Sequence, residues 1–145
     1  PHLYELEITE SSLMEDMDKV RTHLMEMRDL GVTISIDDFG TGYSSLRYLS
    51  TLPIDLLKID SSFISGLTES KGIKSIIEST ITLAHSLGMP VIAEGVATHE
   101  QLDFLIGHGC DQIQGYLCSP PLPPDKLETF LAKHRPDDLF SPELK

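Results

Sequence analysis

Short apolar stretches rich in β-branched residues alternate along the chain with longer stretches in which apolar residues recur every three or four positions. The first pattern predicts buried strands and the second predicts amphipathic helices. Because helical patterns separate consecutive strands, the strands should run parallel and be joined by crossover connections, which indicates an α/β fold. We expect five strands, over residues 4–9, 32–37, 54–60, 89–94 and 110–116.

The clearest amphipathic pattern spans residues 17–30, and Gly31 ends it. Its apolar stripe consists of Met17, Val20, Leu24, Met27 and Leu30. Further helices are expected over residues 73–87, 99–106 and 124–133, with a short one between residues 45 and 52. We expect the apolar stripes of the two longest helices to face the core.

Composition limits the classes of partner. A chain of 145 residues with 40% hydrophobic content can bury one core, so we expect one domain or part of one. Its formal net charge of -12 disfavours nucleic-acid polymers and anionic membranes as partners. No apolar run approaches the roughly 20 residues of a membrane span. The only cysteines, Cys110 and Cys118, would lie too far apart to bridge on one extended segment, which favours a reducing compartment.

Polar and charged side chains occur near the carboxyl ends of all five predicted strands. They are Glu7, Asp37, Asp38, Lys58, Asp60, Glu94 and Gln114. In parallel α/β architectures the carboxyl ends of all strands point to one face, where ligands bind, so these groups should converge. Because a charge at the end of a core strand is costly without a partner, the pattern predicts a polar site at this face.

Each of these residues also has a purely structural interpretation, which for any single position is the more common one. Asp38 could form a turn, and Glu10 and Ser11 could cap the first helix. Lys58 could pair with Glu94 in a salt bridge that performs no chemistry. The six histidines lack ligand spacing and receive no role. The structural interpretation weakens only when all the strand ends are taken together.

The donor types favour hard divalent cations. Carboxylates with a carboxamide, and without a Cys or His cluster, suit Mg²⁺ or Mn²⁺ better than Zn²⁺. The adjacent Asp37 and Asp38 could hold or bridge two ions, and two such ions stabilise the attacking and leaving oxygens in phosphoester hydrolysis. Glu94 could position or deprotonate a metal-bound water that attacks the phosphoester. Lys58 could orient the same water or offset charge on phosphate oxygens.

Five sequence blocks together resemble, in order and spacing, the EAL-domain family of cyclic di-GMP phosphodiesterases. They are EITE at 7–10, DDFGTGYSS at 37–45, KID at 58–60, AEGV at 93–96 and QGY at 114–116. The match runs from the first residues to about Pro121. The resemblance implies a modified TIM (β/α)₈ barrel, dependence on two Mg²⁺ or Mn²⁺ ions, and hydrolysis of cyclic di-GMP to linear pGpG.

The resemblance also implies roles for individual residues. The metal ligands that it implies are Glu7, Asp37, Asp38 and Glu94, with Asp37 bridging the two ions. Glu94 is also implied as the general base, and Lys58 as the lysine that contacts the catalytic water.

Further implied roles lie on the substrate and dimer side. Gln114 matches a substrate-side residue, and Glu10 matches the glutamate that holds the loop after Asp38 in place. In the family this loop, residues 40–45 here, links the metal site to dimer contacts. A homodimer through the loop and a neighbouring helix is therefore implied.

The sequence departs from the family pattern in three ways. The namesake Glu-Ala-Leu triplet is absent, and so is the metal-binding Asn expected on the strand before Tyr4, so two ligands are absent from the sequence. Ala97 stands where many active relatives have a second Glu. A complete barrel has eight strands and about 250 residues, so we expect residues 1–135 to be the C-terminal part of an EAL domain, followed by a tail at 136–145.

Two functions of different classes follow. In the first, the intact parent domain is an active phosphodiesterase, and this chain alone hydrolyses little or nothing because the first metal lacks two ligands. In the second, the domain is a non-catalytic cyclic di-GMP receptor or interaction domain. An unrelated barrel enzyme that uses Asp37 and Asp38 as turn formers is hard to reconcile with five ordered blocks.

The family resemblance also indicates what should cover the edge of the sheet and where the protein should be located in the cell. An incomplete barrel would expose the edge of the strand at residues 4–9, so we expect the missing N-terminal half or a swapped partner to cover it. The family and the thiols imply the bacterial cytoplasm, although parent proteins often carry membrane-bound sensor domains.

Overall fold

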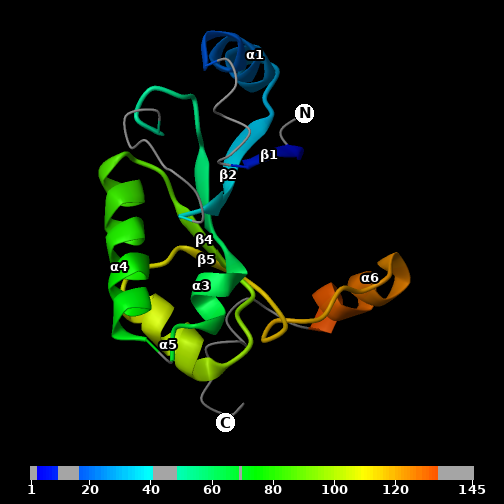
Figure 1. Ribbon diagram of the computed structural model, residues 1–145. Helices are drawn as coiled ribbons and strands as arrows, with labels where there is room; N and C mark the ends of the chain where they lie inside the picture. The colour runs from blue at the N-terminus through cyan, green and yellow to red at the C-terminus, as the bar shows by residue number, and fades with distance from the viewer. Residues whose placement is uncertain (1–2, 10–16, 41–48, 69, 134–145) are drawn as a thin grey trace.

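A computed structural model describes residues 3–9, 17–40, 49–68 and 70–133, and it contains one parallel sheet (Figure 1). The order along the sheet is β1-β2-β3-β4-β5, so each strand lies beside its neighbour in the sequence. The strands are β1 (Glu5–Thr9), β2 (Thr33–Phe39), β3 (Leu56–Ile59), β4 (Val91–Glu94) and β5 (Gln112–Gln114). The prediction of five parallel strands in an α/β fold is confirmed.

Helices separate most consecutive strands in the sequence, and a last helix follows β5. They are α1 (Met17–Asp29), α3 (Ser61–Ser65), α4 (Lys71–Ser86), α5 (His99–Gly107) and α6 (Pro124–Lys133). In Figure 1, α4 and α5 lie on the same side of the strands, whereas α6, drawn in orange, projects away from them. The short helix expected between residues 45 and 52 lies largely outside the described residues. The sequence pattern did not predict α3.

The two faces of the sheet differ in character because successive side chains of a strand point to opposite faces. The residues that form the buried apolar face are Ile34, Ile36, Leu57, Ile59, Val91 and Ala93. Alternate positions on the same strands carry Glu7, Ser35, Asp37, Lys58, Glu94 and Gln114. Helix α4 packs on the apolar face, and Glu7, Asp37, Lys58, Glu94 and Gln114 share the other.

The apolar stripe of α1 is only partly buried. Leu24 is 4% exposed and Val20 is half-buried, but Met27 and Leu30 are 43% and 66% exposed. The expectation that both of these residues face the core was wrong. Because α1 packs on β2, close to the edge of the sheet, the core contacts only part of the stripe.

The stripe of α4 is buried along its centre. Ile77, Ile81 and Ala84 are at most 1% exposed, and the helix packs on β3 and β4. The apolar stripe of the helix predicted over residues 73–87 was expected to face the core, but two of its residues, Ile76 and Leu87, are 46% and 37% exposed. Among the described helices, none has the length and apolar character needed to cross a membrane.

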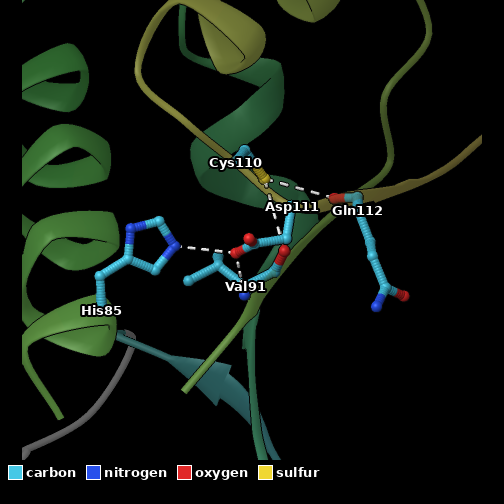
Figure 2. A network of polar contacts seen from close by, with 5 residues as sticks. All are labelled: His85, Val91, Cys110, Asp111 and Gln112. Carbon is cyan, nitrogen blue, oxygen red and sulfur yellow. Dashed lines mark hydrogen bonds and ion pairs between the residues drawn. The ribbon is translucent and has the colours of Figure 1, made fainter. Parts of the chain in front are cut away.

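A network of polar contacts fixes the start of β4 (Figure 2). One carboxylate oxygen of Asp111 accepts a hydrogen bond from the backbone N–H of Val91 at 2.8 Å and lies 2.8 Å from His85 Nε2. Cys110 donates weakly to the carbonyl oxygens of Val91 and Gln112. Both cysteines are free, and burial raises the pKa of the Cys110 thiol to about 11, so this thiol is a poor nucleophile at neutral pH.

Candidate functional site

Lys58 is the centre of the polar face. The residue is only 3% exposed, although it carries a charge. Its ammonium group donates to Glu7 Oε1 at 2.5 Å and lies 2.6 Å from Glu94 Oε1. Residues from β1, β3 and β4 therefore meet at one point, as the convergence of strand ends predicted.

The contact between Lys58 and Glu7 passes over β2, which lies between their two strands. Ser35 pairs with Glu7 on one side and with Leu56 on the other, and Lys58 is two residues beyond Leu56, so the lysine side chain reaches back across β2 toward Glu7. Its small side chain leaves room for the long lysine side chain above it. Ser35 is fully buried, and its Oγ has no hydrogen-bond partner within the described ranges.

The surroundings keep Lys58 protonated. Burial by itself lowers the pKa of the ammonium group. The hydrogen bonds to Glu7 and Glu94, together with the charges of Glu94 and Asp37, outweigh burial and hold this pKa above its ordinary value. Lys58 therefore acts as a fixed cation and hydrogen-bond donor, and not as a base.

Asp37 and Asp38 lie within β2, although the predicted strand ended at Asp37. The pairing with β3 shifts register between Ile36 and Phe39, and Asp38 has φ 57° in the left-handed region, which Asp tolerates better than most residues. The Asp38 N–H donates to Asp37 Oδ1 at 2.9 Å. This irregularity falls at two consecutive carboxylates, and Asp38 lies close enough to Asp60 and Lys58 for their charges to interact with it.

The two aspartates repel each other. The negative charge of Asp37 is the main cause that raises the pKa of Asp38, and desolvation and the charge of Asp60 add to it. Asp60 was placed at a strand end but received no role. It caps α3 by accepting hydrogen bonds from the N–H and hydroxyl of Ser62, and the hydroxyl bond in particular lowers the pKa of Asp60.

The donor chemistry suits a hard divalent ion, but the described side chains do not form a complete cage. The repulsion between Asp37 and Asp38 is what a cation would relieve. However, no group of three or more His, Cys, Asp or Glu side chains in the described part of the chain is placed to hold an ion. Glu7 and Glu94 both contact Lys58.

The end of β5 adds a hollow beside the charged centre. Gln114 pairs with Glu94 in the sheet, which places it next to the ion pairs. A hollow of about 400 Å³ begins at this residue. Its lining is Gln114, Gly115, Tyr116, Ser119, Pro120, Pro121, Leu122, Leu127 and Phe130. Tyr116 is 74% exposed, so its ring is accessible to a ligand.

The turn after β4 contains a buried polar residue that the sequence analysis did not assign. Gln101, in the first turn of α5, is 7% exposed and contacts both this turn and α3. The spacing from Thr98 to Gln101 is the capping-box pattern, which was the available signal. Glu10 and residues 41–45, to which loop and dimer roles were assigned, lie outside the described residues.

The charge conflict at Asp38 gives a testable prediction. Because its folded pKa is raised above the usual 3.8, Asp38 favours the folded state below that pH and costs stability as pH rises through the folded pKa. Asn cannot ionise and accepts positive φ, so Asp38→Asn should raise the unfolding midpoint at pH 7 in EDTA. It should also reduce any upward shift of the midpoint caused by MnCl₂.

The matched control is Asp103→Asn, which removes the same charge from an exposed position on α5. We expect this variant to change neither the midpoint in EDTA nor the response to MnCl₂. A lower midpoint for Asp38→Asn in EDTA would contradict the repulsion between the aspartates. Thermal unfolding followed by circular dichroism measures both effects.

Comparison with known proteins shows the family to which this chain is similar. The family model described as EAL domain matches residues 1–121. The chain is 50% identical over 133 residues to the cyclic di-GMP phosphodiesterase NbdA of Pseudomonas aeruginosa, a match that covers 92% of this chain and 17% of NbdA.

Solved structures give the same result. The chain is similar to the PaMucR phosphodiesterase in its c-di-GMP complex, with a TM-score of 0.84 and 43% identity, over 88% of this chain and 51% of that one. It is also similar to the manganese and c-di-GMP complex of BlrP1 from Klebsiella pneumoniae, with a TM-score of 0.77 and 34% identity, over 83% of this chain and 31% of that one. The chain thus spans about half of the PaMucR structure and less of the others.

Proposed function

This chain belongs to the EAL domain family, and we propose that the protein containing it hydrolyses cyclic di-GMP to linear pGpG with the help of divalent metal ions. The observation that carries this proposal is the placement of Lys58 between Glu7 and Glu94, beside Asp37 and Asp38, at the carboxyl ends of parallel strands. The names of NbdA and of the PaMucR complex support the choice of substrate.

The metal ions that we propose are two Mg²⁺ or Mn²⁺ ions. The residues that would hold them are Glu7, Asp37, Asp38 and Glu94. When bound, such ions supply positive charge for the phosphate oxygens and make water more acidic. The manganese complex of BlrP1 supports a divalent ion in this family.

The side chains of this chain supply the remaining chemistry. In the proposed reaction, Glu94 accepts a proton from the water whose oxygen attacks phosphorus, the P–O3′ bond breaks, and the leaving 3′ oxygen takes up a proton from solvent. Lys58 donates a hydrogen bond to that water and stabilises negative charge in the transition state. This division of roles agrees with the raised pKa of Lys58, which keeps the ammonium group protonated.

Substrate contacts are proposed on the β5 side. Gln114 pairs with Glu94 across the sheet, so a phosphodiester at Glu94 would place an adjoining part of the substrate near the Gln114 carboxamide. The hollow that begins at Gln114 gives this part of the substrate space. The exposed Tyr116 ring lines it.

We also propose how this chain fits into a complete barrel and a dimer. We assign residues 1–135 to the C-terminal part of the EAL barrel and 136–145 to a tail, with the other barrel strands, or a swapped partner, beside β1. Glu10 would hold the loop after Asp38, and that loop would contact a second copy. The free cysteines support a cytoplasmic location.

One observation favours a second function, that of a non-catalytic cyclic di-GMP receptor. Lys58 already contacts two of the proposed metal ligands, Glu7 and Glu94. A domain in which these ion pairs persist would bind the dinucleotide without hydrolysing it.

Release of pGpG separates the two functions. The full-length protein should produce pGpG from cyclic di-GMP with MgCl₂ or MnCl₂, and EDTA should stop the reaction. The 145-residue chain alone should produce little or none. Binding of cyclic di-GMP by the full-length protein with no pGpG in either metal would favour the receptor, and efficient turnover by the isolated chain would contradict our expectation for it.

A further inference from the structure

Gln101 joins three segments through one buried side chain. Its Oε1 accepts hydrogen bonds from the N–H groups of Ala97 at 2.8 Å and Thr98 at 3.1 Å, both in the turn that follows Glu94. Its Nε2 donates to the carbonyl oxygen of Ile64 in α3 at 3.0 Å. The side chain therefore connects the start of α5, the turn after β4 and helix α3.

These segments directly follow the two residues proposed for catalysis. The turn begins one residue after Glu94, and the cap of α3, Asp60, comes two residues after Lys58. A second close contact joins the same segments, because a Cβ atom on Gly95 would lie 2.7 Å from Ser61 Cβ. The carboxyl ends of β3 and β4 are thus fixed to each other beside the ion pair.

Helix capping explains only part of this arrangement. The capping box accounts for the contacts between Gln101 and Thr98, and either Glu or Gln serves at that position. The bond to Ile64 needs a donor, which a carboxylate lacks. A carboxylate would instead face a buried carbonyl oxygen.

We propose that Gln101 is a positioning residue that sets the separation of Lys58 and Glu94 through its bond to α3. This inference rests on the proposed hydrolysis of cyclic di-GMP for its effect on rate, but not for its effect on the ion pair. Loss of the bond lets the ends of β3 and β4 shift, and small misplacements of catalytic groups are costly.

Two variants of the full-length protein test the hydrogen bond from Gln101 to Ile64. Gln101→Glu keeps the acceptors for Ala97 and Thr98 but removes the donor to Ile64, whereas Gln101→Met removes both. We expect kcat for cyclic di-GMP to fall about tenfold or more in both variants, with KM changed less than about twofold. The amides of Ala97 and Thr98 should exchange faster with solvent only in Gln101→Met.

The control is a substitution that also removes a hydrogen bond to a buried backbone group, but at the other end of β4. Asp111→Ala removes the acceptor for the buried Val91 N–H (Figure 2) and should lower the unfolding midpoint, while kcat stays within about twofold of wild type. An equal loss of kcat in Asp111→Ala, or wild-type kcat in Gln101→Glu, would overturn the proposal.

A second measurement does not depend on turnover. The coupling free energy between Lys58→Met and Glu94→Gln, from a double-mutant cycle in urea unfolding, reports the ion pair directly. We expect it to fall to less than half in the Gln101→Glu background and to persist in the Asp111→Ala background. Unchanged coupling in Gln101→Glu would overturn the positioning role. Wild-type protein without turnover would refute the proposed function, and the coupling would still decide this inference.

Discussion

Glu94→Gln and Lys58→Met should each lower kcat for cyclic di-GMP in the full-length protein by about 100- to 10,000-fold. Gln cannot accept a proton from water, and Met cannot donate a hydrogen bond or carry charge. Both replacements have nearly the size of the original side chain, so the loss reflects chemistry more than packing. Separation of pGpG from the substrate by liquid chromatography measures the rate.

Stability should respond differently in the two variants. Lys58→Met leaves Glu7 and Glu94 near each other without the cation that both contact, so it should lower the free energy of unfolding by about 2 kcal/mol in the absence of metal. Glu94→Gln leaves the bond between Lys58 and Glu7 in place and should cost less. Urea unfolding in EDTA gives both values.

Lys126→Met is the control for removal of a lysine charge, because Lys126 lies on an exposed part of α6. It should leave kcat and the free energy of unfolding close to wild type. Turnover by Lys58→Met at the wild-type rate would refute the role of Lys58. Turnover by Glu94→Gln at that rate would refute the general base.

The sheet could be predicted from the sequence because each strand is a short apolar or alternating segment between helical patterns and turn residues. The end of β2 could not, since its last two residues, Asp38 and Phe39, continue the strand beyond Asp37 through a shift in register. Local pattern favours ending a strand at two charges. The pairing with β3, a contact distant in sequence, keeps them within it.

The helices show a similar limit. Periodicity identified the residues of α1 that share one face, but not how much of that face the sheet would cover, and Met27 and Leu30 are exposed as a result. The five residues of α3 are too few for a periodic pattern. The side chain of Asp60, which caps α3, was the local signal for that helix.

Convergence of the site residues was predictable because parallel strands align their carboxyl ends. A salt bridge between Lys58 and Glu94 was one interpretation of the sequence, and the structure contains it. The second contact, from Lys58 to Glu7, was not foreseen. It depends on strand register and on the small Ser35 between the two strands, and neither can be obtained from one strand alone.

Gly115→Ala should lower the free energy of unfolding by about 3 kcal/mol or more, because the new methyl group would overlap backbone that cannot move aside. A Cβ atom at Gly115 would lie 2.2 Å from Val96 O and 2.4 Å from Val96 N. Both atoms are already hydrogen bonded, the N–H to Gln114 O at 3.1 Å and the carbonyl to Leu117 N at 3.0 Å. The substitution therefore forces the ends of β4 and β5 apart.

Two other glycines make the test quantitative. A Cβ atom at Gly88 meets nothing within 4 Å, but φ is +77°, so Gly88→Ala should cost about 1 to 2 kcal/mol. Gly107, the last residue of α5, has open space and no left-handed φ, so Gly107→Ala should be neutral or stabilise by up to about 1 kcal/mol. Urea unfolding of the three variants should give the order Gly115, Gly88, Gly107 from most to least destabilised. If Gly115→Ala costs no more than Gly88→Ala, then β4 and β5 do not approach as closely as the structure indicates, and Gln114 is not fixed beside Glu94 by this contact.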